Sequence, residues 1–405
     1  MDDRTEPQAW PRPPRRRAVK LLLLLISILF SAIVFLALDW YHTAALQREA
    51  GDYSPCRVPD PIRHHSFKPN CDGRHQWGGK TYAFVTNSLG FRDEKVRQVP
   101  LTDDRPRILL LGDSFTEGKL AWPESYVAMI SRHFPQYDFL NGGVSAYSPS
   151  NYLNTARMVL NGGYHIDEVM VFIDMSDVQD EAAFYRDKDD SGAVNGPQRM
   201  LWNRTGYTKY RFTVSKHLSL TDSILSFFER LLAERGHYGA VNATDVEWGA
   251  WTYRKVDEND PSPAGFGPLG VEGGIAKEKA KMTQLYDDLQ KRSIPISVVV
   301  YPYAGQIIHD SADSRQVRIW SEWCEGRCKR FISVFPAFLA AKEECPPGLP
   351  GCWYPKLFIF GDIHYSAGGN TLVADAVIRS LTEEPVAKLP EAGPPPSAIK
   401  ETAVH

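Results

Sequence analysis

The sequence predicts an α/β fold, a three-layer sandwich in which a central, mostly parallel sheet lies between helices. Two observations support this prediction. Residues 108–111 and 169–173 are apolar runs without polar alternation, which is typical of parallel strands covered on both faces. Segments with the apolar spacing of helices separate such runs, and strands that alternate with helices indicate a doubly wound parallel sheet.

Length and composition allow one large domain or two modest ones, because 43% of the 405 residues are hydrophobic. The net charge is only −3. No basic patch interleaved with aromatic residues occurs in the body of the chain, so nucleic acid is not an expected partner.

The N-terminus predicts a membrane anchor. Residues 1–18 are polar and contain Arg15-Arg16-Arg17, and no charged residue occurs from Leu21 to Leu38. About 20 such residues span a bilayer, so residues 19–39 are predicted as a transmembrane helix. The basic cluster then places the N-terminus in the cytosol and the rest of the chain on the exported side. A cleaved signal peptide is the alternative, but its apolar core is usually shorter and no small-x-small site follows Leu38.

Six cysteines lie on the predicted exported side, in three pairs that are local in sequence: Cys56 and Cys71, Cys324 and Cys328, Cys345 and Cys352. Such an even set favours disulfides in an oxidising compartment. A zinc site built from the last four cysteines is a weaker alternative, because their spacings do not match common zinc knuckles. The sequence leaves the connectivity open.

The chain after the anchor divides by composition. Residues 40–104 are predicted as a tether and an irregular extension, 105–382 as the main domain with a lid-like insertion at 182–274, and 383–405 as a disordered tail. The elements expected in the main domain are strands at 108–111, 137–140, 168–174, 294–301, 331–335 and 356–360, and helices at 122–134, 151–160, 220–235, 275–291 and 368–381.

The insertion contains a segment that partly imitates a calcium loop, from Asp187 to Gln198. Its twelfth position is Gln198, whereas calcium loops need a bidentate Glu there. An ordinary acidic surface loop is therefore the preferred interpretation.

The strand at 108–111 leads into Gly112-Asp-Ser114-Phe-Thr-Glu-Gly118. Ser114 would lie at the carboxyl end of a parallel strand, where α/β sheets bind ligands and where a helix start offers free N–H groups. This position suits a nucleophile for acyl transfer. The alternative is a turn whose Ser and Asp only cap a helix. A P-loop is excluded by the spacing of the glycines and by Leu120 after Lys119.

A serine needs a base to act as a nucleophile at neutral pH. Among eleven histidines, His364 alone follows a predicted strand, precedes a helix and has a carboxylate, Asp362, two residues upstream. Asp362 could orient the imidazole while His364 takes the proton of Ser114. The alternative for His364 is a loop residue that caps the last helix. His309 is a weaker candidate base.

Three segments together, Gly112-Asp-Ser114, Asn141-Gly-Gly143 and Asp362-Ile-His364, resemble the SGNH (GDSL-like) hydrolase superfamily over residues 105–381. The resemblance implies that Ser114 is the nucleophile, His364 the general base and Asp362 its partner. It also implies an oxyanion hole formed by the backbone N–H groups of Ser114 and Gly143.

Two further features are similar to SGNH domains linked to O-acetylation of envelope polysaccharides. These are the two-residue spacing of Asp362 and His364, and the turn Thr86-Asn-Ser-Leu-Gly-Phe-Arg-Asp93, which we expect beside the active-site edge.

One position departs from the superfamily. Its third segment usually reads Gly-x-Asn-Asp, with the Asn as an oxyanion donor, whereas Ser176 occupies that position here. Losing such a donor can cost on the order of 10² to 10³ in rate. Either Ser176 or a neighbour such as Asn141 replaces it, or the enzyme is slow toward simple esters. The nearby acidic residues suit helix starts at least as well as catalysis; they are Asp174, Asp177, Asp180 and Glu181.

We therefore expect a serine esterase or O-acyltransferase that acts on acyl esters, in particular acetyl esters, of a cell-envelope glycan. It would need no cofactor and no metal. Its partners would be an acylated polysaccharide, the membrane through the N-terminal helix and, in principle, envelope biosynthesis proteins, with a periplasmic or extracellular catalytic domain. The alternative is a catalytically impaired, membrane-tethered glycan-binding or scaffold protein.

Overall fold

The structure is a computed structural model that describes residues 15–50, 55–77, 80–188, 193–196, 210, 213–214, 216–237, 249–254 and 265–390. The chain forms two compact units. The first comprises Met1–Gly51 and Lys209–Leu225, and the second comprises Asp52–Thr208 and Ser226–His405. Each unit is described by itself below.

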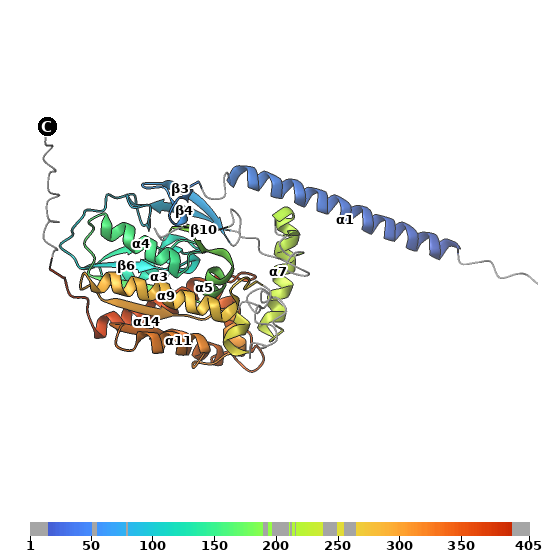
Figure 1. Cartoon of the computed structure of the whole chain (residues 1–405). Helices are drawn as coiled ribbons and strands as arrows, with labels where there is room; N and C mark the ends of the chain where they lie inside the picture. The colour runs from blue at the N-terminus through green and yellow to red at the C-terminus, as the bar shows by residue number, and fades with distance from the viewer. Residues whose placement is uncertain are drawn as a thin grey trace, which may run out of the picture. The chain divides into compact units, whose positions relative to one another are not determined.

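The first unit contains helix α1 (Arg15–Ala50) (Figure 1). Its segment Ala18–Ala45 is the one helix in the described part of the chain that is long and apolar enough to cross a membrane. The side chains of this segment are largely exposed. The expected apolar helix over residues 19–39 is therefore present, while its orientation in a membrane stays a prediction.

The second unit is built on an eight-stranded sheet with the order β12-β11-β8-β6-β7-β5-β4-β3. Five neighbouring strands are parallel: β6 (Arg107–Leu111), β7 (Asp138–Asn141), β8 (Glu168–Ile173), β11 (Ile296–Val300) and β12 (Arg330–Ser333). Chain order reverses direction between β6 and β8, because β7 lies on one side of β6 and the later strands lie on the other. Open α/β sheets place their ligands at the carboxyl ends of the strands at such a reversal.

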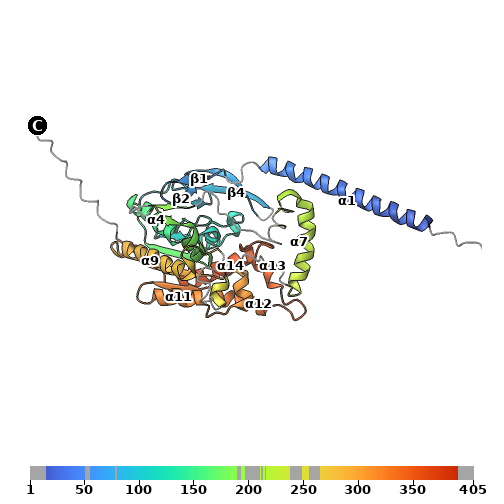
Figure 2. The same ribbon diagram turned by 45° about the vertical axis from the view of Figure 1, so that its right-hand side comes forward.

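Period-two burial of the strands creates two cores. Ile108 and Leu110 of β6 point into one core, and Leu109 and Leu111 point into the other. The first core contains residues of α3 (Tyr126–His133), α13 (Trp353–Leu357) and α14 (Ala367–Glu383). Helices α13 and α14 are labelled in Figure 2. The second contains α4 (Pro149–Asn161), α11 (Arg315–Cys324) and the end of α9 (Gly270–Gln290). Both faces of the sheet are therefore covered, as the apolar runs predicted.

The remaining elements are shorter. They are α2 (Ser114–Glu117), the 3₁₀ turn η1 (Trp122–Glu124), α5 (Ser176–Gln179), the π-turn η2 (Asp180–Phe184), β9 (Arg186–Asp187), β10 (Val194–Asn195), α10 (Ala304–His309) and α12 (Phe335–Glu343). Helix α7 (Ser219–Glu234) falls in the insertion. Of the calcium-like segment at 187–198, residues 189–192 and 197–198 lie outside the described residues.

The extension before residue 105 is more regular than expected. Strands β3 (Asp72–Trp77), β4 (Lys80–Thr86) and β5 (Arg92–Asp93) join the main sheet in antiparallel pairing, and β1 (Arg57–Asp60) pairs with β2 (His64–Phe67). The strand content was missed because β1, β2 and β5 have only two to four residues and β3 is mostly polar, so that strand pairing stabilises them. Strand β4 does carry buried apolar residues, Tyr82 and Phe84, and was overlooked.

A predicted strand at 356–360 is wrong. Helix α13 continues to Leu357. After it, one isolated antiparallel β-bridge joins Phe358 and Tyr365. A short apolar run does not distinguish a buried strand from a buried helix, and here packing of Trp353 and Tyr354 in the core favours the helix.

The predicted disulfides are confirmed, and each joins cysteines that are neighbours in sequence: Cys56–Cys71, Cys324–Cys328 and Cys345–Cys352. This pairing rules out the four-cysteine zinc site.

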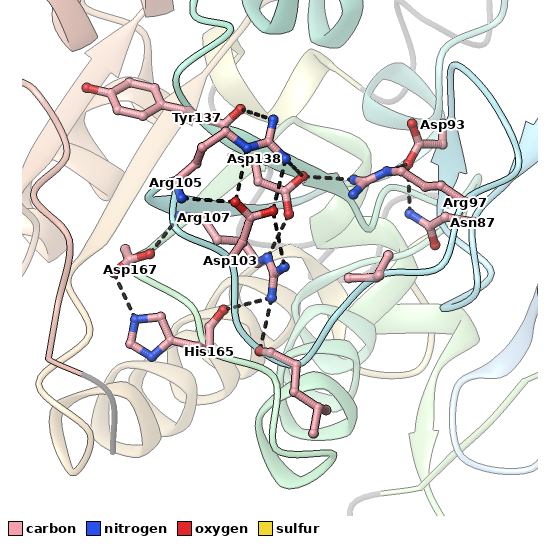
Figure 3. Close-up of polar contacts among 12 residues, drawn as sticks. Asn87, Asp93, Arg97, Asp103, Arg105, Arg107, Tyr137, Asp138, His165 and Asp167 are labelled. Carbon is pink, nitrogen blue, oxygen red and sulfur yellow. Dashed lines mark hydrogen bonds and ion pairs between the residues drawn. The ribbon is translucent and has the colours of Figure 1, made fainter. Parts of the chain in front are cut away.

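An ion network fixes the amino ends of β6 and β7 (Figure 3). The fully buried guanidinium of Arg107 donates to Asp138 at 2.7 Å, and Arg97 donates to the other oxygen of Asp138 at 2.9 Å. Arg97 also binds Asp93, which accepts from Asn87. The last residue of the turn at 86–93, Asp93, is therefore joined through Arg97 to the start of β7.

Candidate active site

The loop after β6 places Ser114 at the first position of the four-residue helix α2. Asp113 caps this helix, because its carboxylate accepts the N–H of Phe115 at 2.9 Å. Ser114 is only 7% exposed. In the described part of the chain no hydrogen bond uses its backbone N–H, so this donor is open to an incoming oxygen.

The three residues expected to act together lie in one hydrogen-bonded row. The Nε2 atom of His364 lies 2.7 Å from the Oγ atom of Ser114, and Nδ1 of His364 bonds the Oδ1 atom of Asp362. Oδ1 of Asp362 also accepts the backbone N–H of His364 at 2.9 Å, which fixes the loop. Burial alone would raise the pKa of Asp362, but the charge and hydrogen bonds of His364 outweigh it and lower this pKa. Asp362 is thus an ionised partner for the imidazole.

Trp77, at the end of β3, is a site residue that the sequence did not indicate. Its indole Nε1–H donates to the Oδ2 atom of Asp362 at 3.0 Å, and its ring meets that of His364 edge to face at 5.2 Å. The Lys119 ammonium lies 4.8 Å from the centre of the same ring. Both oxygens of Asp362 are therefore held, one by His364 and one by Trp77. A tryptophan 285 residues from Asp362 gives no local signal in the sequence.

Arg92 holds the turn that follows the nucleophile. Its buried guanidinium donates to three backbone carbonyls, those of Glu117 at 2.7 Å, Gly118 at 2.6 Å and Leu120 at 2.6 Å. Gly118 has φ +85°, and a Cβ there would lie 2.5 Å from the guanidinium. The turn at 86–93 thus packs beside the active-site edge, and its arginine satisfies the carbonyls that the short helix leaves free.

Glu117 joins the nucleophile helix to the loop after β7. This carboxylate is fully buried and accepts from Lys119 at 2.5 Å, from the Ser145 backbone at 2.6 Å and from the Ser145 hydroxyl at 2.5 Å. Burial would raise the pKa of Glu117, but the charges of Lys119 and Arg57 lower it well below its usual range. A Cβ on Gly143 would lie 2.5 Å from the Glu117 nitrogen, so only glycine permits this packing.

The other expected oxyanion donors are engaged elsewhere. The N–H of Gly143 donates to the Asn141 side chain at 3.0 Å, and the Asn141 amide donates to the Thr116 carbonyl at 2.9 Å. The Ser176 hydroxyl donates to Asp174 at 2.7 Å. The roles of Gly143 and Ser176 in an oxyanion hole therefore stay predictions, since either group would have to exchange its partner to bind an oxyanion.

Two buried carboxyl groups, those of Asp113 and Asp174, lie close to Ser114. Tyr301 bridges them, because its hydroxyl lies 3.1 Å from Asp113 and 3.1 Å from Asp174. The single hydroxyl proton of Tyr301 can be donated to only one of the two carboxyl groups. The hydrogen bond to the other carboxyl group therefore requires a proton on that carboxyl group. Burial first, and then the negative charge of Asp174, raise the pKa of Asp113 to about 7. The Ser114 hydroxyl contacts this same carboxyl at 3.0 Å.

The other acidic residues after β8 have structural partners. Asp177 accepts from Tyr152 at 2.9 Å, and Glu181 accepts from the hydroxyls of Ser148 and Ser150. His309 is exposed at the end of α10, where its ring packs on Tyr253. None of these contacts involves Ser114.

The cavity beside the hydrogen-bonded row of Ser114, His364 and Asp362 is small. A cavity of about 10 Å³ is lined by Phe115, Lys119, His364, Tyr365 and Asn370, which is room for about one water molecule. In the insertion, the buried Trp251 donates to the carbonyl of Met175 at 3.3 Å. This part of the insertion therefore covers the loop that follows β8.

Several solved structures are similar in chain path. An acetylxylan esterase from Geobacillus stearothermophilus has 14% identity and a TM-score of 0.36, and the match covers 70% of this chain and 96% of that chain. A psychrotrophic esterase from Pseudoalteromonas sp. has 11% identity and a TM-score of 0.35, with coverage of 68% and 97%. A GDSL-like lipase from Bacteroides thetaiotaomicron has 9% identity and a TM-score of 0.32, with coverage of 70% and 92%.

No protein-family model and no curated protein matches the chain. The identities and TM-scores above are too low to carry an argument about activity. The chain's own structure has the arrangement that the sequence resemblance implied: a doubly wound parallel sheet, a serine after its first parallel strand, a glycine loop after the second and an Asp-x-His loop before the last helix.

Replacing Trp77 by Phe tests the hydrogen bond from the Trp77 indole to Asp362. The ring contact with His364 is kept, but the hydrogen bond to the carboxylate is lost. A hydrogen bond to a charged group contributes about 1.5–3 kcal/mol, so we expect the rate at which a fluorophosphonate probe labels Ser114 to fall about tenfold or more, with little change in Tm. Trp323→Phe is the matched control, because it removes an indole bond to Thr283 instead. Equal labelling rates in Trp77→Phe and wild type would exclude a positioning role.

Replacing Asp113 by Asn tests the buried carboxyl pair. In the wild type the folded protein retains a proton that the unfolded chain loses above 3.8, the usual pKa of the group. The stability from this raised pKa is therefore complete below that value and is lost as the pH rises toward about 7. The amide keeps the cap to Phe115 but does not titrate. We expect Tm to fall less steeply with pH in the variant, measured by thermal unfolding between about pH 4 and pH 8.

The groups that face Asp113 here are Asp174, Tyr301 and His364. Asp313→Asn, at an exposed surface pair with Arg318, is the control and should follow the wild-type profile. Parallel curves for Asp113→Asn and wild type would show that this carboxyl does not change its protonation on folding.

Proposed function

We propose that this protein is a serine esterase or O-acyltransferase that acts through an acyl-serine intermediate. The observation that carries the proposal is the row of Ser114, His364 and Asp362, in which Nε2 of the imidazole lies 2.7 Å from the serine oxygen. A serine hydroxyl becomes a competent nucleophile when a neighbouring base accepts its proton and a third group orients that base.

The steps follow from this geometry. Ser114 Oγ attacks the ester carbonyl while His364 Nε2 takes its proton, and Asp362 stabilises the imidazolium. The oxyanion faces the open N–H of Ser114. When the ester bond breaks, His364 returns the proton to the leaving alkoxide, and the acyl group remains on Ser114. A water or a sugar hydroxyl, deprotonated by His364, then takes the acyl group and regenerates the serine.

The substrate we propose is an acetyl or other short acyl ester of a cell-envelope glycan. Two features favour a short acyl group over a long chain: Ser114 and His364 are almost buried, and the adjoining cavity is small. Hydrolysis and transfer share the acyl-serine step, and they differ in whether water or a glycan hydroxyl resolves it.

A second candidate is a catalytically impaired glycan-binding or scaffold protein. The observation that favours it is the engagement of Gly143 N–H and the Ser176 hydroxyl with Asn141 and Asp174. A site that cannot release these donors would stabilise an oxyanion poorly.

A fluorophosphonate probe and a short-chain ester separate the two candidates. We expect the wild type to be labelled by the probe and to hydrolyse an acetyl ester, Ser114→Ala to lose labelling, and His364→Ala to lose on the order of 10⁴ in kcat/KM. His309→Ala is the control, since it removes an exposed histidine and should leave the rate unchanged. Wild-type protein that is folded but neither labelled nor active would favour the scaffold. Acetate release with and without an oligosaccharide acceptor then distinguishes hydrolysis from transfer.

We also propose that α1 anchors the protein with its N-terminus in the cytosol and its catalytic unit on the exported side. The basic run before the apolar segment and the three disulfides after it support this orientation. A periplasm-dependent reporter fused after residue 60 should be active, whereas the same reporter fused after residue 18 should be inactive. The opposite pattern would reverse the topology.

A further inference from the structure

Helix α7 carries exposed apolar side chains along one face. Large apolar side chains recur with helical spacing along one face and are 42% to 58% exposed: Leu220, Ile224, Phe227, Phe228 and Leu232. The opposite face carries Ala233, which is fully buried, and the partly buried Glu229. A helix on a water-exposed surface normally has the reverse arrangement, with its apolar stripe toward the core.

The start of α7 is bonded to the end of the apolar segment of α1. Asp39 accepts the N–H of Leu220 at 2.9 Å, the N–H of Thr221 at 2.7 Å and the hydroxyl of Thr221 at 2.6 Å. The Thr43 hydroxyl accepts the N–H of Ser219 at 2.8 Å. Asp39 and Thr43 of α1 therefore supply the partners that the first N–H groups of a helix lack.

These bonds fix where α7 begins with respect to a membrane. Asp39 follows directly on the uncharged run from Leu21 to Leu38, and the exposed aromatic residues Trp40 and Tyr41 come next. A carboxylate at the end of an apolar span, followed by Trp and Tyr, is typical of the boundary between hydrocarbon and headgroups. Because α7 is capped by that carboxylate, its first turn lies at the same boundary.

We propose that α7 is an interfacial membrane helix whose exposed apolar face inserts into the lipid headgroup region on the exported side. The proposal depends on α1 spanning the bilayer and is independent of the catalytic activity. The membrane is favoured as the occupant because the apolar face starts where the span ends, and because its Phe and Leu side chains are those that interfacial helices insert.

The charges on α7 indicate whether electrostatic attraction or burial of apolar surface would bind it to a membrane. Asp222, Glu229 and Glu234 are acidic and Arg230 is basic, so its side chains carry one positive and three negative charges. Anionic lipids would not attract such a helix. Insertion would therefore depend on burial of apolar surface, and it should be as strong in zwitterionic vesicles as in vesicles that contain anionic lipid.

The test uses the full-length protein reconstituted in phosphatidylcholine vesicles. All six native cysteines form disulfides, so a single introduced cysteine can carry an environment-sensitive fluorophore. We expect a label at Phe228→Cys to be blue-shifted and to be quenched several-fold more by nitroxide-labelled lipid than by aqueous iodide. Arg230→Cys is the matched control two residues away on the polar side, and its label should be quenched by iodide. Adding phosphatidylglycerol should not change either result.

Three other outcomes would overturn the proposal. Quenching of both labels by iodide would show that the face is open to water. Protection of the Phe228→Cys label from both quenchers would show that protein covers the face, either another segment of this chain or a second molecule. Insertion that appears only with phosphatidylglycerol would show that charge, and not the apolar face, drives the contact.

Discussion

The position of the nucleophile depends on two buried ionic groups that clamp a helix too short to be stable by itself. A helix of four residues forms few internal hydrogen bonds, so tertiary contacts must hold it. Arg92 binds the carbonyls at its end, and Glu117 connects it to the loop after β7. Burying such charges is costly unless hydrogen bonds compensate them, and here each group has several. The extension before residue 105 is therefore part of the site, because it supplies both Arg92 and Trp77.

Two groups of buried charged or acidic residues lie near Ser114. In the first, Lys119 donates to Glu117 and Arg92 donates to backbone carbonyls. In the second, Asp113 and Asp174 share the hydroxyl of Tyr301, and among the described residues no cation donates a hydrogen bond to either carboxyl. A raised pKa lets this second pair retain a proton, and so limits the negative charge that would oppose an oxyanion at Ser114.

Three disulfides stabilise loops of the second unit. They join neighbouring cysteines in the extension and near α11 and α12. Asp39 has a role that its place beside an apolar run does not suggest. It serves as the cap of a second helix, and this contact joins the start of α7 to α1.

The sequence by itself determined the α/β class, the apolar helix at the N-terminus, the positions of the five parallel strands along the chain, and the two short segments that carry Ser114 and the pair Asp362 and His364. These features depend on local periodicity and on spacing within one loop, which a sequence displays directly. Only the tertiary structure showed that β3 to β5 extend the sheet, that 356–360 is not a strand, and that Trp77 and Arg92 support the site. Their contacts join residues far apart in the chain, so packing decides them. For the same reason the engagement of Gly143 and Ser176 with other partners could not be predicted, since one hydroxyl or N–H group chooses among neighbours that only the folded chain brings together.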